Sequence, residues 1–270
     1  MAEQGMTLRE HLDELRKRLF FSLAVVLVGA IVAFIFRAPI IEFLLAPGFG
    51  QFGTRPQATE VLETVSVIFK IAIMAGFVAA LPVILYQLIM FVSPGLTSRE
   101  RLYLFLFLPG VLAAFVAGVA FGYYVLFPPA LGFLFTFGSE FVDNEFRIAS
   151  YMNIVTSLMF WMGVVFQIPI VMFGLARLGV LRARQMARFR RFGVVLAFVA
   201  AAIITPTFDP VNQVMVAMPI LVLYEFGLLM GKLGERLRRG PAEKTRTPGR
   251  MARAKARVRR WAGKLRFWKR

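Results

Sequence analysis

Long apolar runs alternate along this chain with short segments that hold nearly all of its charged residues. An apolar run of about 18 or more residues is long enough to cross a bilayer as an α-helix. Four runs reach this length and two fall short of it, in the order 19–36, 71–91, 102–127, 151–175, 192–204 and 214–230. The pattern predicts an all-α integral membrane protein with six transmembrane helices, of which the fifth and sixth are short.

Two irregularities shape the predicted bundle. The fifth run, 192–204, reaches only about 20 Å as a helix, against about 30 Å for the hydrocarbon core. A short pair of spans is expected to thin the bilayer beside it or to extend its ends with polar residues. Four runs also contain a proline, namely Pro82, Pro109, Pro169 and Pro219. Proline tends to kink a helix, and kinked neighbours form a concave wall, although prolines are also common in membrane helices generally.

The two ends of the chain differ from this membrane body. Thr7 and Glu10 have the spacing of a capping box, and leucines follow at helical spacing. Residues 1–18 are therefore expected to form a short amphipathic helix at the cytoplasmic membrane surface, running into the first span. Residues 19–230 are the six-span domain. Residues 231–270 form a basic tail that is expected to bind anionic lipid or to be disordered.

Charge indicates the orientation. The net charge is +17, and residues 232–270 supply fourteen of these charges, with sixteen Lys and Arg against two acids. Lys and Arg also gather before the first span, between the second and third, and between the fourth and fifth. Cytoplasmic loops carry such an excess, so both ends of the chain are predicted to be cytoplasmic. We expect membrane lipid, and no nucleic acid, as the partner of the tail.

Catalytic chemistry is poorly supported. The chain has no cysteine and a single histidine, His11, so thiolate and multi-histidine metal sites are excluded. It has no P-loop, no GxGxxG and no HExxH motif, and no nucleophile–base pair lies within the predicted spans. The sequence predicts a binding protein or conduit without cofactor or metal, and not an enzyme.

Acidic residues on the predicted cytoplasmic face are candidates for a binding site. Glu14 precedes the first span and Glu100 lies between the second and third. Two carboxylates could bind the guanidinium groups of a cationic ligand, since arginine–carboxylate pairing is bidentate and strong. The alternative for Glu14 is an i,i+4 ion pair with Arg18, and Glu100 could pair with a neighbouring arginine.

Three further polar residues are candidates within or beside the spans. Gln167 and Glu225 fall inside predicted spans, where a polar group is costly and suggests a function. The alternative for Gln167 is a helix–helix hydrogen bond. Asp209 lies in a tight external turn, which aspartate also favours for structural reasons. A small-solute secondary transporter is the alternative function, and Gln167 and Glu225 are its only midplane candidates.

Several motifs together resemble the TatC family, the core subunit of the twin-arginine protein translocase. They cover about 7–230, in family order, and read HLDELRKRL from His11, AP at Ala46, LPVILYQ from Leu81, FVSPGL from Phe91, RER from Arg99, FGY from Phe121, FP at Phe127, FQIP from Phe166, and TP…D…Q from Thr205 to Gln213. The series is far more specific than any one of its pieces. One position departs from the family, because Gln167 stands where many members have a glutamate.

The resemblance implies a function and a set of roles. It implies a signal-peptide receptor and assembly core that exports folded proteins across the cytoplasmic membrane of a prokaryote by using the proton-motive force. Its partners would be twin-arginine signal peptides and the single-span proteins TatA and TatB. The resemblance assigns signal-peptide binding to Glu14, Arg16, Phe91 and Glu100. For transport or partner contact, the candidates are Pro47, Gln167, Asp209 and Glu225.

Overall fold

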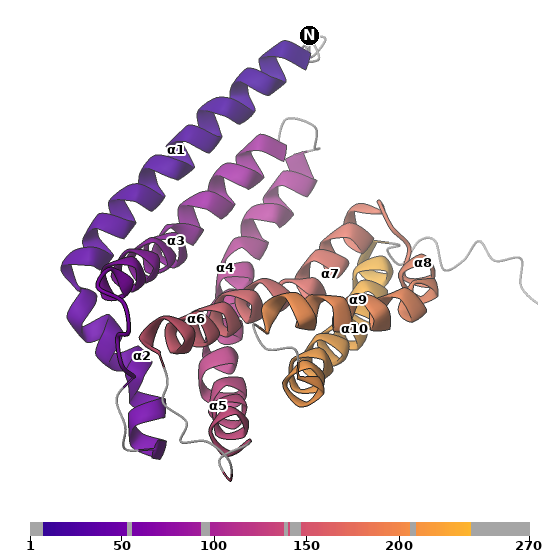
Figure 1. The fold of residues 1–270 in the computed structure, drawn as a ribbon. Helices are drawn as coiled ribbons and strands as arrows, with labels where there is room; N and C mark the ends of the chain where they lie inside the picture. Colours follow the sequence, from indigo (N-terminus) through magenta and orange to yellow (C-terminus); the bar gives the residue numbers. More distant parts are fainter. Residues whose placement is uncertain are drawn as a thin grey trace, which may run out of the picture.

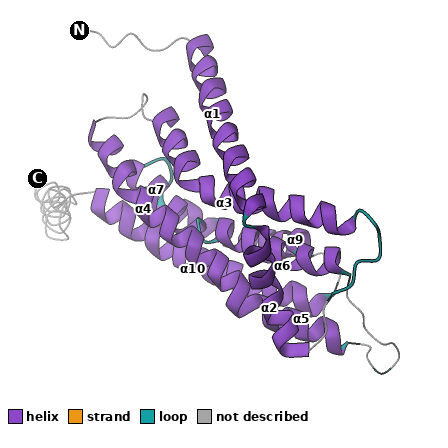
Figure 2. Ribbon diagram, turned by 90° about the vertical axis from the view of Figure 1, so that its left-hand side faces the viewer, coloured by secondary structure: helices purple, strands orange, loops and turns teal. Residues whose placement is uncertain are grey.

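The computed structural model describes residues 8–52, 56–92, 98–137, 140, 147–205 and 209–238, with the backbone alone at 8, 49–52, 92, 98–101, 103 and 104. The described residues are almost entirely helical (Figure 2). In chain order the helices are α1 (Leu8–Ile35), α2 (Arg37–Phe52), α3 (Glu63–Val92), α4 (Ser98–Phe121), a π-helical turn (Gly122–Leu126), α5 (Phe127–Thr136), α6 (Ile148–Val165), α7 (Ile168–Leu178), α8 (Ala183–Arg188), α9 (Arg190–Ile204) and α10 (Pro210–Arg238).

The predicted membrane spans are found in this order. Five helical stretches of the described chain are long and apolar enough to cross a membrane. The remaining predicted span corresponds to α9, whose 15 residues reach about 22 Å. The all-α membrane class is therefore confirmed, and the fifth span is short. The sixth is not, since α10 has 29 residues and extends past both predicted limits of that span.

Several boundaries differ from prediction. Helix α1 passes through the predicted boundary at residue 18 without a break, so the N-terminal segment continues the first span and is not a separate surface helix (Figure 1). The third span lengthens through the π-helical turn into α5. The fourth divides into α6 and α7 at Phe166–Gln167, directly before Pro169. The other three prolines lie inside α3, α4 and α10 without ending them.

The helices do not form a parallel bundle but splay around α6 (Figure 1). All but one of the largest fully buried side chains come from α5 and α6, with Tyr151, Phe127 and Leu131 among them, and the exception is Val216 of α10. Helix α1 crosses α3 through two glycines. An added Cβ on Gly29 would lie 2.9 Å from the carbonyl oxygen of Gly76, too close for any larger residue at this crossing.

The segment after the first span forms α2, which the hydrophobic pattern did not predict. Tyr151 of α6 fastens it: the hydroxyl donates to the carbonyl of Leu44 at 3.0 Å and accepts from the amide of Gly48 at 3.1 Å. The Tyr123 hydroxyl donates to the carbonyl of Phe43 beside it. We call this side, where α2 lies and α3 and α6 begin, the outer end. The inner end is where α1 begins, α3 ends and α4 begins.

Candidate functional site

The inner end holds a carboxylate in an unusual setting. Arg18 donates from Nε to Oε1 of Glu14 at 3.0 Å, and its Nη2 forms an ion pair with the same oxygen. The i,i+4 pairing considered for Glu14 is therefore present. Arg18 also donates from Nη1 to Oε1 of Gln87 on α3, at 3.2 Å. Arg18 thus links α1 to α3, because it bonds Glu14 on its own helix and Gln87 on α3.

The second oxygen of Glu14 is not used. Oε2 is buried and has no hydrogen-bond partner, although the side chain as a whole is 19% exposed. A buried carboxylate oxygen without a donor is costly, so it is a strong acceptor for any cation that reaches it. Since Arg18 fixes the other oxygen, Oε2 is held in one orientation.

An aromatic contact positions the same part of α1. The rings of His11 and Phe91 stack with centroids 4.3 Å apart and planes inclined by 17°. Phe91 therefore packs against α1 about one helical turn before Glu14 and supports this part of the helix. Arg16 does not join this group: two residues along the helix from Glu14, it points to another face and lies over the ring of Phe20 at 5.7 Å.

Glu100 falls in the first turn of α4, and its side chain lies outside the described residues. The start of α4 is at the same end of the molecule as the start of α1 and the end of α3 (Figure 1). The predicted meeting of Glu14 with Glu100 stays a prediction at the level of side chains.

The other predicted site residues lie elsewhere. Gln167 occupies the break between α6 and α7, where its Nε2 donates to the carbonyl of Gly163 at 3.2 Å. Its Oε1 is buried without a partner. Pro47 lies inside α2, next to the glycine that donates to Tyr151.

Asp209 and Glu225 take structural roles. Asp209 accepts from the amide of Asn212 at 2.6 Å and from its side chain at 3.0 Å, as expected of the turn before α10. Glu225 pairs with Arg190 at 2.7 Å, and both side chains are half exposed. An exposed ion pair is not a midplane ligand, so the transporter hypothesis loses one of its two candidates.

Sequence reasoning missed Glu63, the best-bound carboxylate of the described chain. Its oxygens accept from the backbone amides of Thr59 and Ala149 at 2.9 Å each, and from that of Glu60 at 3.2 Å. Arg147 adds an ion pair at 3.4 Å. The sequence signal was that Glu63 precedes the second predicted span and Arg147 precedes the fourth, on the same predicted side of the membrane.

Comparison with known proteins identifies the fold and the family. Residues 10–219 match the family described as Sec-independent protein translocase protein (TatC). A TatC from Synechocystis sp. is 41% identical over 231 residues, covering 84% of this chain and 90% of that protein. A chloroplastic TATC from Arabidopsis thaliana is 39% identical and covers 86% and 68%.

The crystal structure titled as the twin arginine translocase receptor TatC superimposes with a TM-score of 0.76 at 36% identity. It covers 83% of this chain and 99% of that one. None of these relatives supports the small-solute transporter. The chain belongs to the TatC family, and is a multi-pass membrane component of the twin-arginine protein translocase and not an enzyme.

Proposed function

We propose that this protein is the receptor for twin-arginine signal peptides, and that Glu14 binds one of the two arginines. The observation that carries the proposal is the buried, unpartnered Oε2 of Glu14 at the inner end. A solved relative is titled as the twin-arginine translocase receptor, which agrees with this role. The site would face the cytoplasm of a prokaryote, where precursors with signal peptides are made.

The geometry of Glu14 would favour arginine over lysine as its ligand. Oε1 of Glu14 is already held by Arg18, so an incoming guanidinium finds Oε2 fixed in direction. Guanidinium presents several donors in a rigid fork, whereas lysine offers a single point charge on a flexible stem. The second arginine would bind Glu100, which opens α4 at the same end. Arg18 also offsets the charge of Glu14, so the site attracts cations without a large excess of negative charge.

Two other predicted residues have supporting parts. Phe91 positions the site by stacking on His11, so it acts on α1 and not on the peptide arginines. Arg16, exposed on another face of α1, would contact the flanking polar part of the peptide or lipid phosphate.

Assembly would use polar groups of the membrane-spanning helices. The single-span partners TatA and TatB would dock their transmembrane helices on the chain, with the unpartnered Oε1 of Gln167 as a polar anchor. Pro47 inside α2, Asp209 before α10 and Glu225 within α10 would contribute further contacts for transport or for these partners. Export would be driven by the proton-motive force, and Gln167, being neutral, cannot take up a proton itself.

The test is site-specific crosslinking of the full-length chain in membranes to a twin-arginine signal peptide. Glu14→Gln keeps the shape and removes the charge, so crosslinking should fall at least about tenfold. Asp13→Asn is the matched control, since it removes a neighbouring exposed acid from the same helix and should change little. A peptide whose two arginines are replaced by lysines should bind as weakly to the wild type.

The proposal fails if Glu14→Gln combined with Glu100→Gln crosslinks like the wild type. It also fails if the lysine peptide binds as well as the arginine peptide.

A further inference from the structure

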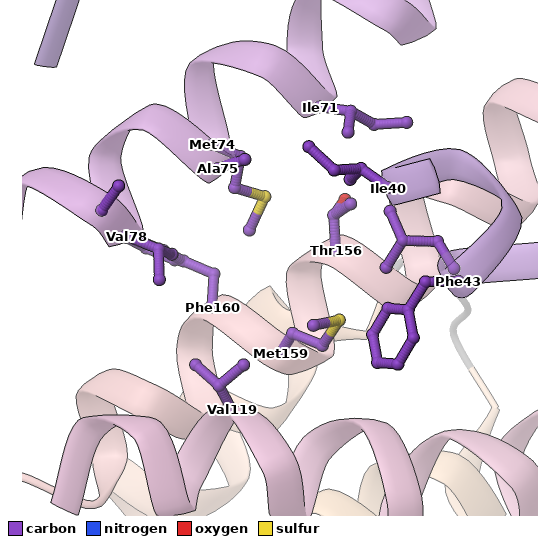
Figure 3. Close-up of a pocket in the computed structure, with 12 residues that line it drawn as sticks. Ile40, Phe43, Ile71, Met74, Ala75, Val78, Val119, Thr156, Met159 and Phe160 are labelled. Atoms are coloured by element: carbon purple, nitrogen blue, oxygen red, sulfur yellow. The ribbon is translucent and has the colours of Figure 1, made fainter. Parts of the chain in front are cut away.

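An apolar pocket lies between α2, α3, α4 and α6 and encloses about 330 Å³ (Figure 3). Met74 and Val78 of α3 face it from one wall, and Met159 of α6 and Phe43 of α2 from the opposite side. Most of the lining side chains are only partly buried, so the pocket is open on one side. It lies toward the outer end, and its lining residues on α3 are about 12 to 24 Å along the helix from Gln87 at the proposed peptide site.

Thr156 is the one lining residue whose side chain has a hydrogen-bonding group. The hydroxyl of Thr156 donates to the carbonyl of Met152, one turn earlier in α6. Every other lining side chain is aliphatic, aromatic or a thioether. An extended peptide here would leave its backbone groups without partners, which is costly in an apolar medium. A hydrocarbon chain has no backbone polar groups and avoids this cost.

A polar pair lies at the outer edge of this pocket. Lys70 is one helical turn outward from Met74, and Asn153 is one turn outward from Thr156. The Nζ of Lys70 donates to Oδ1 of Asn153, so the pair joins α3 to α6 above the apolar lining.

Lys70 keeps binding capacity. An ammonium group has three donors, and the contact with Asn153 uses one. Within the described part of the chain, no carboxylate forms an ion pair with Lys70. Lys70 lies about 10 Å along α3 from its first residue, a depth from which a lysine reaches the headgroup layer by extending its side chain. A charge near an apolar region is a mark of function.

We propose that this pocket binds one phospholipid of the outer leaflet. One acyl chain fills the space between α3 and α6, and the phosphate accepts from Nζ of Lys70, with the side-chain amide of Asn153 beside it. The charge of Lys70 complements the phosphate, and the lining complements the chain. The bound lipid completes the packing between α2, α3 and α6 and does not depend on signal-peptide binding.

The test is native mass spectrometry of the purified full-length chain in detergent, titrated with phosphatidylglycerol. The wild type should retain one lipid more tightly than the rest. Lys70→Ala should weaken it about tenfold by removing a charge-assisted hydrogen bond, and Lys70→Arg should keep it. Ala75→Phe, which fills the pocket, should remove it. Diacylglycerol, which lacks the phosphate, and glycerol phosphate, which lacks the chains, should not displace it.

Two matched controls make the result specific. Arg37→Ala removes another exposed cation near the outer end, and Ala200→Phe fills a different apolar pocket, between α7, α9 and α10. Both should retain the lipid. The proposal is overturned if Lys70→Ala binds like the wild type, or if both controls lose lipid equally. It is also overturned if a signal peptide crosslinks at position 75 while the wild type holds no tightly bound lipid. If Ala75→Phe does not fold, the comparison of lipid retention by Lys70→Ala and Lys70→Arg is sufficient to test the proposal.

Discussion

A carboxylate at the outer end of the molecule and one at the inner end have opposite hydrogen-bonding environments. At the outer end, Glu63 accepts from three backbone amides and pairs with Arg147, so both of its oxygens are occupied. At the inner end, Glu14 has one oxygen held by Arg18 and the other unpartnered. Saturated donors and acceptors stabilise a structure, whereas a fixed, unsatisfied acceptor is prepared for a ligand. Glu63 thus contributes to the stability of the outer end, whereas Glu14 has the free acceptor that the proposed peptide binding requires.

Removing Glu63 should give the largest effect. Glu63→Ala leaves three backbone amides without their acceptor and removes one of the two carboxylates that pair with Arg147, so we expect Tm in detergent to fall by roughly 10 °C. Glu60→Ala is the control, since Glu60 contacts the same arginine from an exposed position and should change Tm little. An equal effect of both variants would show that Glu63 is not the centre of the outer end.

Tyr151 should come next. Tyr151→Phe removes the hydroxyl that joins α6 to the carbonyl of Leu44 and the amide of Gly48 in α2. We expect a loss of about 1–3 kcal/mol in the free energy of unfolding, measured by denaturant titration. Tyr124→Phe, at an exposed neighbouring position, should cost less than about 0.5 kcal/mol.

Substitutions at the inner end should change signal-peptide binding more than they change the free energy of unfolding. His11→Ala removes the stack on Phe91 and should cost about 0.5–1.5 kcal/mol. Because α1 then loses a support beside Glu14, crosslinking to the signal peptide should fall as well. His11→Phe retains an aromatic ring and should restore both quantities. Normal crosslinking by His11→Ala would separate the stack from the site.

The smallest effect is expected at Glu225. Its ion pair with Arg190 is exposed on both sides, so Glu225→Gln should change the free energy of unfolding by less than about 1 kcal/mol. The change should disappear in high salt, which can be followed in the same denaturant titration. A large, salt-independent loss would mean that this pair is buried in the assembled protein.

Local features could be predicted from the sequence. The spans follow from apolar runs, and the Glu14–Arg18 pair follows from a spacing of four residues on one helix. Asp209 before α10 is likewise a neighbour effect. These contacts join residues close in the chain, so periodicity and turn chemistry are enough to predict them.

Contacts between distant segments could not be predicted. The contact of Glu63 with Ala149 joins residues more than eighty positions apart, and that of Tyr151 with Leu44 more than one hundred. The contacts of Tyr151 fasten helix α2, whose sequence alone looked like a loop. The break before α7 could not be predicted either. Pro169 follows a helix break, whereas the other three prolines of the spans lie inside unbroken helices, and the sequence does not distinguish the two cases.

The unbroken length of α1 has a mechanical consequence. From Glu14 to the glycine crossing at Gly29 the helix measures about 22 Å, with no proline between them. The N-terminal half of α1 also packs on α3, through the stack of His11 on Phe91 and the hydrogen bond of Arg18 to Gln87. If the inner end binds a peptide as proposed, a pull there would be carried along one continuous helix to the close crossing of Gly29 on Gly76.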